Sequence, residues 1–223
     1  MTRLGRLISA LVGGLWIAAT ATPVLAHPHV WVTYETTVNY DKGAVTGVSH
    51  VWTFDDMYTA MAIQGLDKNG DGAYSREELA ELAQTNMDGL KDFSYFTFAK
   101  LANADLKFSG PEDAWLEYVN GILRLHFRLP LAQPVLAEAE GFNYSIYDPS
   151  FFIAFEPEKT DAVKVSSAPQ GCTAALVDPS ADQSAEQTKR LGDAMAQNLG
   201  GDLAAGMGSY GTAMTVRVSC KKT

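Results

Sequence analysis

Residues 67–78 have the sequence DKNGDGAYSREE, which fills every position of a twelve-residue EF-hand calcium loop. Ca2+ prefers about six to eight oxygen ligands, and such a loop supplies them from positions 1, 3, 5, 7, 9 and 12. Gly72 occupies position 6, where the chain turns sharply and a side chain is disfavoured. The predicted calcium ligands are the side chains of Asp67, Asn69 and Asp71, the carbonyl of Ala73, Ser75 directly or through a water, and Glu78 as a bidentate ligand.

Apolar residues at helical spacing flank this loop on both sides, which predicts a helix–loop–helix unit over residues 55–90. The alternative is a polar surface turn between two helices, since Asp, Asn and Gly are also turn-forming residues. Tyr74 stands at position 8, which usually holds a smaller aliphatic residue that faces a second loop, and the sequence contains no second loop. An unpaired loop with three carboxylates is expected to bind Ca2+ with a Kd of about 10⁻⁴ to 10⁻³ M. The flanking apolar residues are Tyr58, Ile63 and Leu66 before the loop, and Leu79, Leu82 and Ala83 after it.

The first 26 residues have the features of a secretory signal peptide. Arg3 and Arg6 form the basic start, residues 7–19 are apolar, and residues 24–26 form a small-residue cleavage site. Cleavage would leave His27 as the first residue of an exported chain, with no stable membrane insertion afterwards. The alternative is an uncleaved anchor, although the apolar run is short for a membrane span.

Composition narrows the class of protein. The whole chain has a formal net charge of −9, and removal of a signal carrying two Arg and no acid makes the mature chain still more acidic. An acidic chain without a basic cluster argues against nucleic-acid binding. The sequence also lacks a serine nucleophile elbow, a glycine-rich phosphate loop and a His-Glu-x-x-His motif, so we do not expect an enzyme.

The chain has two cysteines, Cys172 and Cys220. An even number of cysteines in an exported chain favours a disulfide between them. Two free structural thiols are the alternative.

Alternating apolar residues predict β-strands over much of the chain. Residues 30–40 and 44–54 form a predicted antiparallel hairpin around a turn at 41–43, and residues 117–119 and 122–129 form a second one around Asn120-Gly121. Pro130 and Pro134 are expected to end that second pair of strands. Further β segments are expected within residues 93–108, 142–155, 162–166 and 172–177 and near the C-terminus.

Residues 180–203 are instead spaced as a late amphipathic helix, with Leu191, Met195 and Leu199 on one side. The predicted fold class is α+β, mainly antiparallel β and sandwich-like. It forms a single β-rich domain over residues 27–223, with the EF-hand unit inserted and the amphipathic helix near the end.

His27, His29 and His50 are the candidate transition-metal ligands. His27 would offer both a free α-amine and an imidazole after cleavage, a chelate suited to Cu2+, Ni2+ or Zn2+. The first hairpin could return His50 close to His29. The alternative is that His27 and His29 are a frayed terminus and that His50 is an ordinary strand residue.

Several stretches together resemble the bacterial family named domain of unknown function 1007. They are residues 26–32 (AHPHVWV), 47–58 (GVSHVWTFDDMY), 67–78, 129–131 (LPL), 147–152 (YDPSFF) and 216–220 (VRVSC). The resemblance spans nearly all of the mature chain and transfers no catalytic residue. It implies a periplasmic protein linked to an ABC-type transporter or an inner-membrane metal permease, with the family's histidine pair at His27 and His29. Asn69 departs from the Asp often found at that loop position.

These observations predict a periplasmic, calcium-binding, non-enzymatic protein that serves as an accessory metal-binding component of a divalent-metal transport system. One alternative is a calcium-stabilised protein-interaction module without transition-metal chemistry. Another is a copper-dependent oxidase with an N-terminal histidine site.

Overall fold

The computed structural model describes residues 28–150, 152–178 and 213–221. The predicted signal peptide, His27 and the predicted amphipathic helix at 180–203 therefore lie outside the described residues. Within the described residues, no helix is both long and apolar enough to cross a membrane.

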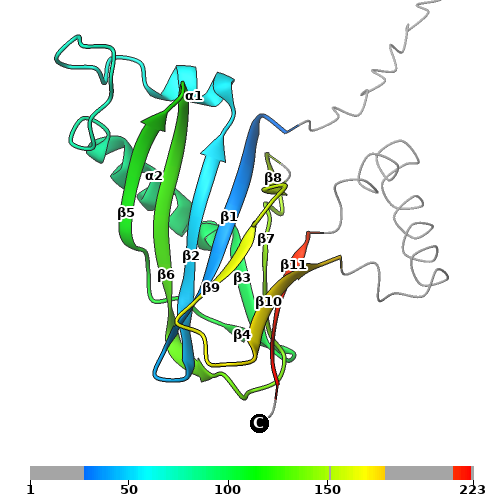
Figure 1. Cartoon of the computed structure of the whole chain (residues 1–223). Helices are drawn as coiled ribbons and strands as arrows, with labels where there is room; N and C mark the ends of the chain where they lie inside the picture. The colour runs from blue at the N-terminus through cyan, green and yellow to red at the C-terminus, as the bar shows by residue number, and fades with distance from the viewer. Residues whose placement is uncertain (1–27, 151, 179–212, 222–223) are drawn as a thin grey trace, which may run out of the picture.

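Two β-sheets face each other and form most of the molecule (Figure 1). The first sheet has the order β5 (Glu112–Val119), β6 (Ile122–Leu136), β2 (Ala44–Phe54), β1 (Val30–Asp41) and β8 (Ile153–Pro157), and β9 (Val163–Ser166) also pairs with β1. The second has the order β10 (Cys172–Val177), β11 (Thr215–Cys220), β7 (Phe142–Ile146), β3 (Thr97–Leu101) and β4 (Ala104–Leu106). The prediction of a β-dominant α+β fold is confirmed.

Both predicted hairpins are present. Lys42 and Gly43 have φ angles of 46° and 79° between β1 and β2, and Asn120 and Gly121 have φ angles of 54° and 86° between β5 and β6. Left-handed conformations at both central residues belong to the tight turn whose twist matches that of paired strands. The short turns therefore set the register of both pairs next to the turn, up to the irregularities at Asn39/Tyr40 and Glu112/Trp115.

The β5–β6 pair ends at Arg128, just before Pro130, as expected from the sequence, whereas β6 itself continues to Leu136. Gly47 of β2 lies opposite Pro130, and the pairing of the two strands shifts register between Val45 and Gly47. A Cβ atom on Gly47 would lie only 2.4 Å from the carbonyl oxygen of Leu129. Between these two partners β6 has residues 131–134 against Thr46 alone in β2, so the irregularity lies in β6, and Gly47 lets the two backbones approach closely beside a proline that lacks an N–H group.

Two strand pairings were not expected from the sequence. β8 and β9 both run parallel to β1 and share its free edge, with Val30 opposite Ile153 and Thr36 opposite Val163. The chain therefore passes from β7 in the second sheet to β8 in the first. The loop that makes this crossing borders the groove described below.

The hydrophobic core lies between the sheets and includes Trp52, Tyr34 and Tyr144. The Thr36 and Tyr144 hydroxyls, from opposite sheets, lie 2.8 Å apart. The predicted disulfide is confirmed, with Cys172 and Cys220 directly opposite each other in the β10–β11 pair and an S–S distance of 2.03 Å.

Two helices and one short turn complete the described structure. They are α1 (Asp56–Ala62), α2 (Ala80–Lys91) and η1 (Ser94–Phe96). Figure 1 shows α1 at the upper end of the first sheet and α2 behind β5 and β6. Leu79, Ala83 and Met87 belong to the same hydrophobic core as the strands, so the first turn and one face of α2 are anchored on the sandwich.

Candidate metal centre

The predicted calcium loop connects α1 to α2, and the structure fixes its entry. Asp55 caps α1, because its carboxylate accepts a 2.7 Å hydrogen bond from the Tyr58 N–H. The same carboxylate accepts a 2.7 Å bond from the Trp31 N–H of β1. One side chain therefore starts the helix and attaches it to the first strand.

Asp67 organises the first half of the loop. Its carboxylate accepts hydrogen bonds from the backbone N–H groups of Gly70 at 2.8 Å, Asp71 at 3.2 Å and Gly72 at 3.0 Å. Gly70 and Gly72 have φ angles of 73° and 78°, conformations that other residues rarely adopt. No atom lies within 4 Å of a Cβ built on Gly72, so backbone conformation rather than space requires glycine there.

Asp71 and Asn69 form the second group of oxygens. Asp71 accepts a 2.8 Å hydrogen bond from the Ala73 N–H and a 2.9 Å bond from the side-chain amide of Asn69. The amide oxygen of Asn69 accepts a 2.9 Å bond from the Asp71 N–H. The loop thus presents its oxygens from a backbone held by its own side chains.

Glu78 closes the loop from its far end. It accepts 2.9 Å hydrogen bonds from the backbone N–H groups of Lys68 and Ser75, and the Ser75 hydroxyl donates to it as well. The Glu78 N–H donates back to the Ser75 hydroxyl at 3.2 Å, so the pair also forms a capping box at the turn before α2. These bonds, led by that from the Ser75 N–H, lower the pKa of the Glu78 carboxyl below its usual value.

The donor set suits a hard cation, although the carboxylates do not converge. Among the described residues, no three His, Cys, Asp or Glu side chains lie close enough together to hold a metal ion. Asp67, Asp71 and Glu78 instead accept backbone hydrogen bonds. A carboxylate has about four acceptor sites, so these bonds leave capacity for an ion. The loop's side-chain donors are all oxygens, the ligand type that Ca2+ prefers.

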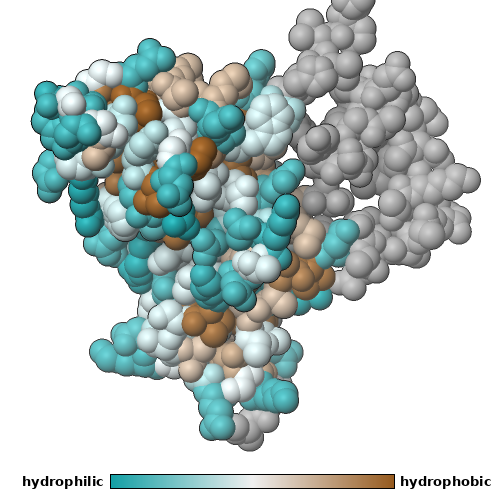
Figure 2. Space-filling view, turned by 45° about the horizontal axis from the view of Figure 1, so that its top comes forward, coloured by the Kyte–Doolittle hydropathy of each residue, from teal (hydrophilic) through white to brown (hydrophobic). Residues whose placement is uncertain are grey.

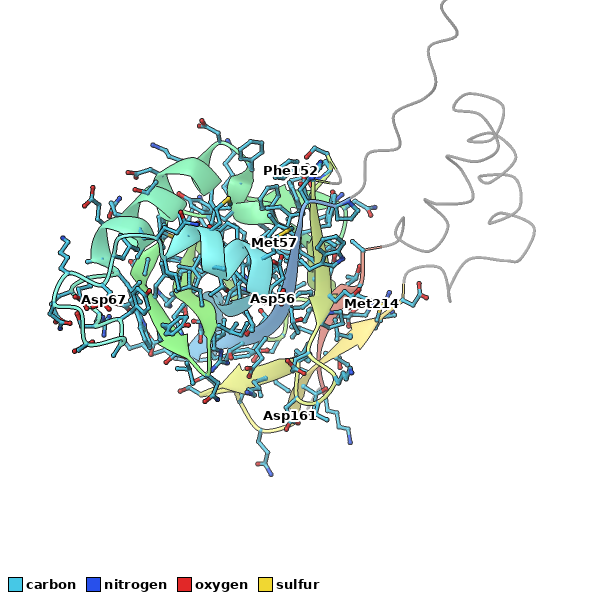
Figure 3. The ribbon with its side chains drawn as sticks, turned by 90° about the horizontal axis from the view of Figure 1, so that it is seen from above. Asp56, Met57, Asp67, Phe152, Asp161 and Met214 are labelled. Carbon is cyan, nitrogen blue, oxygen red and sulfur yellow. A yellow bond between two sulfur atoms is a disulfide. The ribbon has the colours of Figure 1, made fainter. Side chains whose placement is uncertain are left out.

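Aromatic contacts seat the loop on the edge strand β5. The Tyr74 ring meets the Tyr118 ring edge-on, with 4.7 Å between centroids. The Arg76 guanidinium lies 4.6 Å from the centre of the Trp115 ring, which stacks on His126. Sequence reasoning noted the unusual Tyr74 but missed its partners, because they follow the loop by about forty residues. Figure 3 shows Asp67 at the outer edge of the molecule.

The expectation that the hairpin brings His50 to His29 is wrong. His50 lies opposite Thr36, in the middle of the β1–β2 pair, and only 2% of its surface is exposed. It packs between the sheets against Phe127, with ring centroids 5.0 Å apart. The sequence contains a signal of this burial. His50 is two residues from both Val48 and Trp52, so the three side chains share the inward face of the strand.

His29 lies outside the sandwich, just before β1. Its imidazole packs on the Phe152 ring at a centroid distance of 4.9 Å, and its backbone N–H donates to the Phe152 carbonyl oxygen at 2.8 Å. The side chain is exposed. Since His27 falls outside the described residues, the proposed chelate of His27 and His29 stays a prediction.

Comparison with known proteins places the chain among relatives. A protein of Haemophilus influenzae described as "Uncharacterized protein" is 28% identical over 162 residues, covering 72% of this chain and 77% of that protein. The "Uncharacterized 15.5 kDa protein in trpE 3'region" of Spirochaeta aurantia is 28% identical over 116 residues, covering 51% of this chain and 82% of that protein.

The family resemblance noted from the sequence is also confirmed. The profile of the family described as "Protein of unknown function (DUF1007)" matches residues 12–220. Because this match spans well over half of the chain, the protein belongs to the DUF1007 family.

Proposed function

We propose that this protein binds Ca2+ through residues 67–78, as a non-enzymatic module in which the ion fixes the α1–α2 unit to the edge of the sandwich. The observation that carries the proposal is the ring of hydrogen bonds between Asp67 and the amides of residues 70–72, closed by Glu78. The ligands would be Asp67, Asn69, Asp71 and Glu78 with the Ala73 carbonyl and Ser75.

The position of Glu78 explains what a bound ion would do. Leu79 follows it directly and is fully buried in the core beneath α2. A ligand bond at Glu78 would therefore hold the start of α2, while Tyr74 and Arg76 hold the loop on β5. This arrangement favours a structural ion over a signalling one.

Replacement of Glu78 by Gln tests the proposal. Gln can also serve at the third position of a capping box, so the turn before α2 is preserved while the carboxylate ligand is lost. We expect isothermal titration calorimetry to show calcium affinity at least about tenfold lower for Glu78→Gln than for the wild type.

Glu77→Gln is the matched control, since it removes the same charge from the neighbouring position, which is not a ligand. Its calcium affinity should stay within about twofold of the wild-type value. Equal affinity of Glu78→Gln and the wild type would reject the loop as the calcium site.

We also propose that the protein works in the periplasm as an accessory component of divalent-metal transport. This role is supported by the predicted signal peptide and by what the family resemblance implies about a permease or ABC-type partner. With His50 buried, the transition-metal ligands reduce to the amine and ring of His27 and to His29.

Elemental analysis of the mature protein after exposure to Ca2+, Zn2+, Ni2+ and Cu2+ tests this role. We expect one tightly held transition metal per chain, lost when an extra residue blocks the amine of His27. Calcium alone, or a transition metal that survives the blocked amine, would reject it. The calcium proposal would stand in either case.

The second candidate is a calcium-stabilised interaction module. It is favoured by an apolar groove between the two helices and the loop that enters β8. The groove adjoins the calcium unit, because Tyr58 of α1 and Leu82 of α2 both line it.

A further inference from the structure

The groove has a volume of about 510 Å3 and runs along one face of α2. Leu82, Asn86, Gly89 and Leu90 line it at helical spacing, which defines a stripe of about 12 Å. Ala83 and Met87, on a neighbouring face, are the buried residues of the helix. Leu82 and Leu90 are half-buried against the core, so the sandwich covers this face of α2 only in part.

Two phenylalanines stand at the rim of the groove. Phe93 is 54% exposed and Phe152 is 53% exposed, and both line the groove together with α2. Seen from above, Phe152 and α2 border the same side of the molecule (Figure 3). Exposed aromatic side chains beside a groove are typical anchors of protein interfaces.

The chain holds Phe152 in place with a buried carboxylate. Asp148 is 5% exposed and accepts hydrogen bonds from the backbone N–H groups of Ser150, Phe152 and Ile153 at 2.7, 3.1 and 3.0 Å. These bonds fix the backbone of the crossing loop on both sides of the groove-facing ring. The aromatic ring is therefore held at the rim before any partner arrives.

A strained turn holds Phe93. The residues that follow it, Ser94, Tyr95 and Phe96, have φ angles of 54°, 52° and 47°, which are left-handed values at three consecutive residues with side chains. Such conformations are unfavourable for residues with side chains and cluster at functional sites. The Phe93 and Phe96 rings stack across this turn at 5.4 Å.

A row of exposed acidic residues lies beside the groove. Glu81, Asp88 and Asp92 are exposed and follow one another at i, i+7 and i+11, so they form one row along the border of the α2 stripe. None of the three forms an ion pair with another residue of the described chain. This row, on a chain of net charge −9, repels an anionic membrane surface and attracts a basic partner.

We propose that this groove binds an amphipathic α-helix of a partner protein, whose apolar face packs between Phe93, Phe152 and the α2 stripe and whose Lys or Arg residues face the acidic row. The length of the stripe matches about two turns of such a helix. This inference does not depend on calcium binding by residues 67–78.

A synthetic peptide of about 18 residues provides the probe, long enough to form a helix, with Leu on one face and Lys on the other. Fluorescence anisotropy with the full mature protein should show saturable binding. A peptide with the same Leu face and Glu in place of Lys should not bind, because the acidic row repels it.

Gly89→Leu fills the groove, since no atom lies within 4 Å of a Cβ at this position. We expect it to weaken binding of the Leu/Lys peptide about tenfold or more. Ala80→Leu is the matched control, because it places the same side chain on an exposed position of the same helix outside the groove and should change the Kd less than about twofold.

Three results would overturn the proposal. They are no binding of the Leu/Lys peptide to the wild type, equal binding to Gly89→Leu, or equal binding of the Glu peptide. Dimerisation of the wild type that Gly89→Leu abolishes, seen by sedimentation, would also overturn it and assign the groove to a second copy of the chain.

Discussion

His50 shows how strongly burial controls the chemistry of one residue. The Thr97 hydroxyl donates its proton to the Tyr95 carbonyl at 2.9 Å, so it accepts from the His50 Nε2–H at 3.3 Å. Nδ1 then carries the lone pair and has no hydrogen-bond partner among the described residues. Burial lowers the pKa of the His50 imidazole to about 3, because a charged ring would lie among aromatic side chains. The residue is a neutral part of the core rather than a metal ligand.

This burial predicts a loss of stability in acid. The unfolded chain binds a proton at His50 below about pH 6.5, whereas the folded chain stays neutral there until about pH 3. The part of the free energy of unfolding that depends on His50 is therefore at its full value above about pH 6.5. It falls by about 1.4 kcal/mol for each pH unit below that. Between pH 7.5 and 5.0, the free energy of unfolding measured in urea should fall by about 2 kcal/mol less for His50→Leu than for the wild type. Parallel losses in the two proteins would contradict this account.

At the scale of the elements, two glycines have opposite roles. Gly47 lies where the backbones of β2 and β6 approach closely, and a Cβ there would overlap the Leu129 carbonyl oxygen at 2.4 Å. Gly89 lies in the last turn of α2 with open space beside it. One glycine is required by a close backbone approach, and the other weakens its helix.

Replacement of glycine by alanine should therefore change the free energy of unfolding in opposite directions at Gly47 and Gly89. Gly47→Ala is expected to lower the free energy of unfolding by about 1–3 kcal/mol, because β2 and β6 must move apart. Gly89→Ala should raise it by about 0.5–1 kcal/mol, since Ala favours the helix. Urea unfolding measures both values, and a change of the same sign at the two sites would refute the explanation.

At the scale of the whole molecule, one core joins the sheets and the helix α2, while a disulfide closes the far edge. Cys172 and Cys220 link β10 to β11 across a sequence separation of 48 residues. β11 in turn pairs with β7 and so connects the C-terminal end of the chain to the second sheet. Figure 2 shows that hydrophobic side chains on the face in view form small, separate patches within a mainly hydrophilic surface.

Loss of the disulfide should destabilise the molecule as a whole. A cross-link that closes a loop of this length restricts the unfolded chain by up to about 4 kcal/mol in the chain-entropy model. The double variant Cys172→Ser, Cys220→Ser should unfold at lower urea concentration than the oxidised wild type. Wild-type protein reduced with dithiothreitol is the control and should match the variant. Equal midpoints for the oxidised wild type and the variant would argue against a stabilising role.

The sequence determined what depends on neighbours along the chain. Asn120-Gly121 demanded a tight turn, and alternation fixed the strands on both sides of it. The spacing of residues 67–78 likewise predicted a loop between two helices, and two cysteines in a chain with a predicted signal peptide predicted the disulfide. The turn and the loop are determined by residues within a few positions of one another. The disulfide could be predicted because two cysteines allow only one pairing.

Only the tertiary structure decided which distant segments meet. It placed β8 and β9 parallel to β1, seated Tyr74 on Tyr118 and left the groove beside α2 uncovered. It also moved His50 from a proposed metal site to the core. Alternation along a strand says which side chains point to one face, but the packing of the opposite sheet decides whether that face is buried.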